Sequence, residues 1–257
     1  MSAVTERVVS ELVLASASPR RLALLRQVRV PVVAVPADID ETRAPGEAAV
    51  PYALRMASEK AHAGLVRVAH ALPERRGAWV IAADTIVVVD GETLGKPRDD
   101  HEARAHIRLL AGRAHEVITA VAIGREGGPF EVGAQHTVVH FRALRDAEVD
   151  AYVATGEGHD KAGSYGIQGI GAGLVQRVEG CYFNVVGLPL SHTLGRLVAL
   201  GALPILIPGL GAMTLGSAAG PLVVGLVLGR LQRTGRVVWT LPHQASEVLT
   251  QLGLLLF

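Results

Sequence analysis

The chain has 257 residues, enough for one large domain or for a domain with an appendage. Its formal net charge of +1 argues against a surface that coats nucleic acid, so we expect no nucleic-acid partner. The single cysteine, Cys181, excludes an intrachain disulfide framework and a cysteine metal cluster, which favours a reducing compartment. The charged N-terminal residues lack the apolar core of a secretory signal.

The stretch LVLASASPRR predicts a buried strand over residues 12–15 and a helix over residues 19–28. Ser18 has the residue type of an N-cap, and a proline follows it at the first helical position. Arg20 and Arg21 then stand at the positive end of the helix dipole, where cations are unfavourable. This arrangement indicates a polyphosphate ligand at the helix start, with two solvated arginines beside an ordinary cap as the alternative.

The middle of the chain alternates between strand and helix patterns, and it holds an Asp90-Gly91 pair typical of a hairpin turn. Two hairpins among alternating elements predict an α/β protein with a mixed sheet flanked by helices rather than a purely parallel one. In chain order we expect an acidic, proline-rich loop (35–47), a helix (51–69), two apolar runs (78–95), a helix closed by Gly112, strands (115–124 and 135–144), a helix (146–155), a glycine-rich loop (158–173), a strand (174–178) and a helix from Pro189.

Asp84 lies inside WVIAADTIVVV, a run that we expect to be buried on both faces. An unpaired buried carboxylate costs several kcal/mol, so this one requires a metal, a cation or a raised pKa. Lys60, in RMASEK, and Lys96, in GKPRD, are candidate partners, although a single lysine of either kind is usually a solvated surface residue. A carboxylate that caps local backbone at a kink is the alternative.

Two loops carry further candidates. Asp38, Asp40 and Glu41 form an acidic loop whose oxygens suit a hard divalent cation, while the spacing alone favours an ordinary polar surface loop. The loop KAGSYGIQG supplies Lys161 and Gln168 among glycines, which permit close backbone approach to a ligand, and a glutamine can read a base edge through two hydrogen bonds.

His136 and His140 have the spacing of a helical zinc pair but lie in a β-branched stretch. On a strand, four residues span about 13 Å, so we expect these histidines to be structural or exposed rather than metal ligands.

Seven blocks together resemble one family: LASASPRR, DIDET, ASEKA, AADTIVVVDGETLGKPRD, HEVITAV, DKAGSYGIQG and YFNVVGLPL. In order and spacing they are similar to the Maf family of nucleoside triphosphate pyrophosphatases, over residues 10–203. The resemblance implies a fold like that of the inosine-triphosphate pyrophosphatases, with a twisted mixed sheet in two lobes around a deep cleft, often in a homodimer. It also implies hydrolysis of a nucleoside triphosphate to the monophosphate and pyrophosphate with a divalent cation, Mg²⁺ or Mn²⁺.

Carried over by resemblance, Asp84 matches the family's proton acceptor, and Asp84 and Glu41 are the residues expected at the metal. The family contains a dTTP/UTP subgroup and a 7-methyl-GTP subgroup, and Arg20, Thr85 and Gln168 resemble the first of them. Cys181 stands where a serine is common. The family's polar cleft residues are matched by Ser16, Ser18, Arg20, Arg21, Glu41, Lys60, Lys96 and Gln168.

Residues 204–257 lie beyond the usual end of the family, and residues 197–229 contain no charged side chain. We therefore expect a Maf-like domain over residues 1–203 and an apolar, helical tail over residues 204–257 that is long enough to span a bilayer. Residues 220–257 resemble part of an aspartate:alanine exchanger-type transporter. A gene fusion, a frameshift, or an amphipathic helix packed on the domain are the alternatives for the tail.

The leading hypothesis is a cytoplasmic enzyme that hydrolyses dTTP, UTP or modified pyrimidine nucleotides, with a tail that can associate with the inner membrane. Two other functions stay open on the sequence alone. One is a nucleotide-binding regulator of septum formation, and the other is a membrane-tethered fusion protein.

Overall fold

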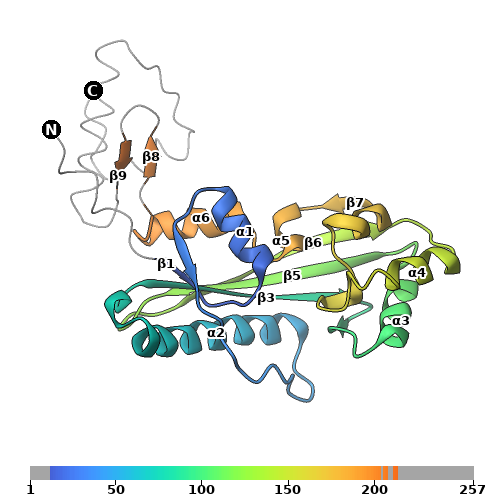
Figure 1. Cartoon of the computed structure of the whole chain (residues 1–257), viewed down its shortest axis with the longest axis horizontal. Helices are drawn as coiled ribbons and strands as arrows, with labels where there is room; N and C mark the ends of the chain where they lie inside the picture. The colour runs from blue at the N-terminus through green and yellow to red at the C-terminus, as the bar shows by residue number, and fades with distance from the viewer. Residues whose placement is uncertain (1–11, 204, 208–210, 214–257) are drawn as a thin grey trace, which may run out of the picture. The chain divides into compact units, whose positions relative to one another are not determined.

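The computed structural model describes residues 12–203, 205–207 and 211–213 of the chain (Figure 1). The chain divides into two compact units, one of residues 10–194 and one of residues 1–9 and 195–257. The first unit contains the large sheet and every residue discussed below as part of the candidate site.

The large sheet has seven strands and is mixed, as the sequence predicts. Its order is β2-β1-β3-β5-β6-β7, with β4 paired to β3. β1 is parallel to both β2 and β3, whereas the β3–β4, β3–β5, β5–β6 and β6–β7 pairs are antiparallel. The strands are β1 (Leu12–Leu14), β2 (Val32–Ala34), β3 (Trp79–Val89), β4 (Glu92–Leu94), β5 (Ala114–Gly124), β6 (Glu131–Phe141) and β7 (Val175–Glu179).

Helices connect and cover these strands. The helices are α1 (Pro19–Gln27), α2 (Ala49–Ala71), α3 (Asp100–Leu110), α4 (Asp146–Val153), α5 (Tyr182–Val186) and α6 (Leu190–Ala199), with short 3-10 turns η1 (Pro73–Arg75), η2 (Ala162–Ser164) and η3 (Gly169–Leu174). The bounds of α1, α2, α3 and α4 agree with the predicted helices to within two residues.

Chain connectivity explains why α1 and α2 lie on opposite faces of the sheet. The β1–α1–β2 crossover runs to one side of β1, and the β2–α2–β3 crossover returns to the other side. Because parallel crossovers are right-handed, the two helices must cover opposite faces. Figure 1 shows α2 along one face and α1 with α5 on the other.

Small residues let α2 approach the sheet closely. Ala53, Ala57 and Ala61 recur at four-residue spacing and are fully buried in one apolar cluster with β1 and β3. At Gly64 a Cβ atom would lie 2.5 Å from the Cβ of Ala15, so no larger residue fits without a shift. This close contact places Lys60, next to Ala61, within reach of β3.

The β3–β4 connection is the predicted hairpin. Asp90 and Gly91 have φ angles of 52° and 82°, and Val89 pairs with Glu92. Positive φ at both central residues is the geometry of a tight turn that matches strand twist, and Asp-Gly is one of its preferred sequences.

Four elements, β2, α5, β8 and β9, differ from the sequence-based expectation. β2 and α5 were not predicted, because a three-residue half-buried strand and a one-turn helix are too short to show a period. In the predicted helical tail, the structure describes two paired strands, β8 (Ile205–Ile207) and β9 (Gly211–Met213), so helix is wrong for those six residues. The rest of the tail lies outside the described residues.

Among the helices that the structure describes, none combines the length and the apolar character that crossing a bilayer requires.

Candidate active site

A cleft of about 690 Å³ opens in the unit of residues 10–194. Its walls come from the end of β1, the start of α1, the middle of β3, the end of the β3–β4 hairpin, and the segments 160–168 and 185–187. All site residues proposed from the sequence line it: Ser16, Ser18, Arg20, Arg21, Glu41, Lys60, Asp84, Thr85, Lys96 and Gln168.

Asp84 is buried at the floor of the cleft and is paired with a cation. Only 8% of the residue is exposed, and its Oδ1 lies 2.6 Å from the Nζ of Lys60. The same Nζ lies 2.8 Å from Oε1 of Glu41. Of the alternatives left open by the sequence, the cation partner is the one observed. The strand pairing continues through Asp84, opposite Ala120, without a register shift.

Glu41 is held as a carboxylate. Burial raises its pKa, but the hydrogen bond and charge of Lys60 outweigh that effect and bring the pKa below its ordinary value. Lys96 and Arg21 lower it further through their charges. One lysine therefore joins two carboxylates that come from a loop and from a strand.

Arg21 connects three parts of the cleft. Its Nε donates to the carbonyl of Gly187 at 2.8 Å, one terminal nitrogen donates to Ser16 Oγ at 3.3 Å, and the other donates to Thr85 Oγ1 at 3.1 Å. Burial lowers the pKa of Arg21, although the nearby charge of Asp84 acts in the opposite direction. The guanidinium is thus fixed by neutral oxygens and keeps a partly exposed charge toward the cleft.

The two serines shape the start of α1. Ser18 is the N-cap, and its hydroxyl accepts weakly from the Arg21 backbone N–H at 3.5 Å. Ser16 Oγ accepts from the Ser18 backbone N–H at 3.1 Å as well as from the Arg21 side chain. The predicted cap is therefore confirmed.

Arg20 points to a different partner from Arg21. One terminal nitrogen lies 3.3 Å from Oδ2 of Asp160, and the other carboxylate oxygen of Asp160 lies 2.6 Å from Nζ of Lys161. Lys96 and Gln168 lie exposed on the cleft wall. Arg20 thus contacts the segment 160–168, whereas Arg21 contacts Ser16, Thr85 and Gly187.

A polar relay under the cleft was not predicted from the sequence. Thr119 Oγ1 donates to the carbonyl of Asn184 at 2.8 Å and lies 2.9 Å from Thr85 Oγ1. Because a threonine hydroxyl has one proton, Thr85 must donate to Thr119, which leaves the Thr85 oxygen to accept from Arg21. The signal in the sequence is indirect: Asn184 is an amide within the apolar stretch YFNVV, and its side chain fixes this stretch by donating to the carbonyl of Val117 and to Thr137 Oγ1.

The segment 157–171 forms the opposite wall and is held by local hydrogen bonds. The carboxylate of Glu157 accepts from the backbone N–H groups of Ile170 and Gly171, each at 2.8 Å. Gly163, with φ of 68°, approaches β3 so closely that a Cβ there would lie 3.0 Å from Val87 side-chain carbons. The absence of a side chain at Gly163 thus lets the loop pack against β3, while close approach of these glycines to a ligand stays a prediction.

Two buried histidines support that segment from behind. His106 Nδ1 lies 2.7 Å from Ser164 Oγ, and His115 Nε2 lies 2.8 Å from the hydroxyl of Tyr165. Burial lowers the pKa of His106, and it lowers the pKa of His115 to about 4. Both rings are therefore neutral at physiological pH.

The carboxylate pair fits a hard divalent cation that shares its coordination with a ligand. Among the described residues no group of three or more His, Cys, Asp or Glu side chains could hold a metal ion alone. Asp84 and Glu41, however, both reach Lys60 Nζ, so their oxygens face a common point. One or two carboxylates completed by phosphate oxygens and water is the usual way in which proteins bind Mg²⁺.

The remaining candidates lie outside this arrangement. Asp38 faces Arg67 at 3.6 Å, and Asp40 accepts from the backbone N–H and the hydroxyl of Thr42. His136 and His140 pair with Glu116 at 2.7 Å and Glu179 at 3.1 Å, respectively. His136 is exposed and His140 is half-buried, in agreement with the expectation that they are structural or exposed. Of the three acidic residues Asp38, Asp40 and Glu41, only Glu41 lines the cleft.

A mixed α/β sheet with a cleft that gathers arginine, lysine and carboxylate groups defines an α/β protein with a site for an anionic, phosphate-like ligand. The Maf-like protein family model matches residues 11–200. The chain belongs to the Maf family, which confirms the resemblance seen in the sequence. A second model, described as a predicted permease membrane region of the Asp-Al_Ex type, matches residues 188–257.

Curated relatives are similar over nearly their whole length. The chain is 50% identical over 189 residues to a dTTP/UTP pyrophosphatase of Alcanivorax borkumensis, covering 72% of this chain and 93% of the relative. It is 47% identical over 204 residues to one of Symbiobacterium thermophilum, covering 79% of this chain and all of the relative. Among solved structures, a dITP/XTP pyrophosphatase of Mycobacterium abscessus is 17% identical with a TM-score of 0.36, covering 74% of this chain and 97% of that one, which is a remote likeness.

Proposed function

We propose that the chain hydrolyses dTTP and UTP to the nucleoside monophosphate and pyrophosphate. The proposal rests on membership in the Maf family and on relatives named dTTP/UTP pyrophosphatases that match almost end to end. The structural observation that carries it is the buried Asp84–Lys60 pair in a cleft that two arginines also line.

The triphosphate binds at the cationic side of the cleft. Arg20, Arg21, Lys60 and Lys96 offset its charge, and Ser16 and Ser18 line the helix start beside it. Arg21 supports this role best, because its neutral hydrogen-bond partners leave its positive charge uncompensated by any direct ion pair among the described residues.

Asp84 accepts a proton from the attacking water or orients it. The water oxygen bonds to the α-phosphorus, the bond from that phosphorus to the bridging oxygen breaks, and pyrophosphate leaves. Asp84 and Glu41 would hold a Mg²⁺ or Mn²⁺ ion, which when bound supplies positive charge to phosphate oxygens. Lys60, Arg20 and Arg21 offset the charge that grows on the leaving group.

The base is read at the other side. Gln168 lines the cleft with an exposed side chain, and its amide can both donate to and accept from a pyrimidine edge. Thr85 acts less directly, because its hydroxyl already accepts from Arg21 and donates to Thr119. The combination of Arg20, Thr85 and Gln168 supports the dTTP/UTP subgroup.

The proposal also includes three further features that the family resemblance implies. They are a two-lobed arrangement around the cleft, a homodimer, and action in the cytoplasm, where nucleoside triphosphates are found. For the part of the tail outside the described residues, a membrane segment stays a prediction, supported by the permease-region match over residues 188–257, with a gene fusion or a frameshift as the alternative.

A nucleotide panel tests the function directly. The full chain is incubated with dTTP, UTP, dCTP, GTP and 7-methyl-GTP in the presence of Mg²⁺ or Mn²⁺, and products are separated by ion exchange. We expect dTMP or UMP with equimolar pyrophosphate, and slower turnover of the other nucleotides. Orthophosphate as the first product would instead identify a phosphatase that cleaves the terminal phosphate.

A further inference from the structure

Glu41 lies in a segment without regular structure, between β2 and α2, yet its carboxylate reaches Lys60 on the floor of the cleft. The Glu41 side chain is 48% exposed, so packing alone does not fix it. The next helix begins at Ala49 with no side-chain cap at Ala48. Something else must therefore hold this segment against α2.

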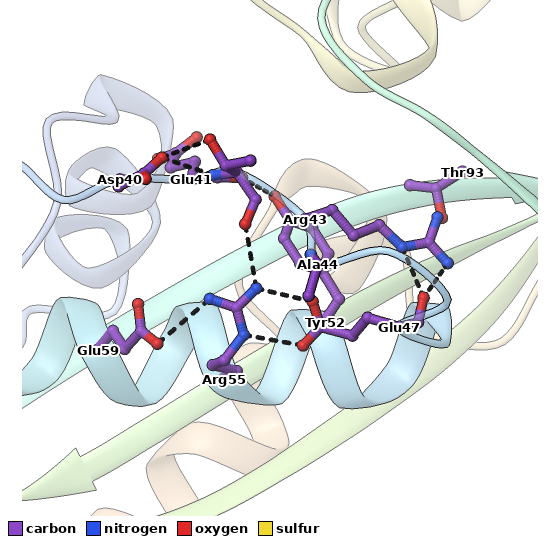
Figure 2. Close-up of polar contacts among 10 residues, drawn as sticks. Asp40, Glu41, Arg43, Ala44, Glu47, Tyr52, Arg55, Glu59 and Thr93 are labelled. Atoms are coloured by element: carbon purple, nitrogen blue, oxygen red, sulfur yellow. Dashed lines mark hydrogen bonds and ion pairs between the residues drawn. The ribbon is translucent and has the colours of Figure 1, made fainter.

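Figure 2 shows a set of side chains that does so, centred on Glu47 and Arg55. Arg55 Nε lies 2.8 Å from one carboxylate oxygen of Glu47, and a terminal nitrogen lies 2.7 Å from the other. This two-pronged geometry is the strong form of an arginine–carboxylate pair. The Glu47 side chain is only 14% exposed, which separates this pair from ordinary surface ion pairs of little worth.

The same groups also hold the backbone at Glu41 and on its C-terminal side. Arg55 donates to the carbonyl of Thr42 at 3.2 Å, and the hydroxyl of Tyr52 donates to the carbonyl of Glu41 at 2.8 Å. Glu47 accepts from the Ala44 backbone N–H at 3.1 Å. Two residues one turn apart on α2 thus fix two consecutive carbonyls, beginning with that of Glu41.

Arg43 ties the segment to the opposite side. Its side chain donates to the carbonyl of Glu47, with the Nε contact at 2.7 Å, and to Thr93 Oγ1 at 3.1 Å. Thr93 lies on β4, next to the stretch that carries Lys96. The segment is therefore clamped between α2 and the β3–β4 hairpin (Figure 2).

We propose that Glu47, Tyr52 and Arg55 form a positioning clamp that sets the carboxylate of Glu41 beside Lys60 and Asp84. The clamp residues act only through Glu41. Because Glu41 is a proposed metal residue, this inference rests on the proposed function. Groups that orient a ligating carboxylate typically change metal affinity or activity by about 10- to 100-fold when removed.

The first test needs no turnover, so it stands even if the proposed reaction is wrong. Amide hydrogen exchange of the full chain is compared for Arg55→Met and Arg104→Met. Arg104 is a matched control, because its side chain has the same 33% exposure and pairs with Asp150 at 2.8 Å away from the cleft. We expect faster exchange in residues 40–47 for Arg55→Met only. Equal exchange in both variants would overturn the clamp.

The second test asks whether the clamp acts through Glu41. With dTTP and varied Mn²⁺, Arg55→Met is expected to lower kcat/KM by about 10- to 100-fold and to raise the Mn²⁺ concentration for half-maximal rate. In a Glu41→Gln background the same change should cost less than about twofold, because the group being positioned is already gone. If the double variant instead lost kcat/KM by the product of the two single-variant factors, Arg55 would act independently of Glu41, and the proposal would be overturned.

Milder variants guard against a folding defect. Tyr52→Phe removes only the hydroxyl that donates to Glu41 and should lower kcat/KM by about fivefold. Arg55→Lys keeps the charge but not the two-pronged contact, so its activity should fall between that of the wild type and Arg55→Met. The clamp would be contradicted if Tyr52→Phe kept the kcat/KM of the wild type and if Arg55→Lys lost as much kcat/KM as Arg55→Met.

Discussion

The two walls of the cleft are stabilised in different ways. On the first wall, which includes the floor of the cleft, Asp84, Lys60 and Glu41 come from β3, α2 and the loop between β2 and α2, and they join through charge. On the second wall, the segment 157–171 is held by a carboxylate on backbone N–H groups and by neutral histidines. The first wall concentrates buried charge where phosphates would bind, and the second offers the amide of Gln168, which suits a base, beside the Asp160–Lys161 ion pair.

The difference follows from the cost of burial. A charge can lie at the floor of a cleft only when partners compensate it, and removing one partner of a buried pair costs about 3–5 kcal/mol. Neutral hydrogen bonds have a smaller net worth of about 1 kcal/mol each. Changes in the first wall should therefore affect catalysis strongly, whereas changes in the second should be milder and appear mainly in stability.

The largest effect is expected on the first wall, for Asp84→Asn. Loss of the proton acceptor should lower kcat by about 10²- to 10⁴-fold, measured by pyrophosphate release from dTTP. The chain should still fold, because Lys60 keeps Glu41 as a partner at 2.8 Å. Asp90→Asn is the matched control, since Asp90 is exposed at the hairpin turn and Asn-Gly suits the same turn. Equal rates for the two variants would remove Asp84 from the reaction.

The second wall should respond to acid through His115. Its pKa is about 4 in the folded protein, against 6.5 when unfolded, so the unfolded chain binds more protons between these values. Stability is therefore fully present above about pH 6.5 and is lost as the pH falls toward 4. We expect this histidine to account for about 2 kcal/mol of lost unfolding free energy between pH 7 and pH 5.

Urea denaturation of the wild type and His115→Gln at those two pH values measures this contribution. The variant lacks the titrating ring. Between pH 7 and pH 5 its unfolding free energy should therefore fall by about 2 kcal/mol less than that of the wild type. Parallel pH dependence in the two proteins would mean that the ring is not held neutral by its buried site.

Much of the first wall was predictable from the sequence, since its signals are local. Ser18 before a proline marks the helix start, Asp90-Gly91 marks a hairpin, and Asp84 stands out among aliphatic residues. The mixed sheet follows from the same patterns. The neighbours of Asp84 in space could not be predicted in this way. The sequence shows that Asp84 needs a cation, but it does not show whether Lys60 or Lys96 supplies it.

Contacts between residues that are distant in the sequence could not be predicted from it. The bond from Thr119 to Asn184 spans 65 positions, and Arg55 belongs to a helix face that looks like an ordinary charged surface. Thr119 and Arg55 break no local rule, and although Asn184 stands out within YFNVV, the sequence does not show which residues it meets. Only packing of α5 against β5 brings the amide stretch under Thr85.

The smallest expected effect concerns that relay, which lies under Thr85 and Arg21. In Thr119→Val the carbonyl of Asn184 loses its donor and Thr85 loses its acceptor, so the unfolding free energy should fall by about 1–2 kcal/mol. Thr193→Val is the matched control, because that buried hydroxyl has no hydrogen-bond partner among the described residues. Its replacement by a methyl group of similar size should leave stability unchanged or slightly raised. If urea denaturation instead gave equal losses for both variants, the hydroxyl relay would contribute nothing beyond packing, and Thr85 would be held by Arg21 alone.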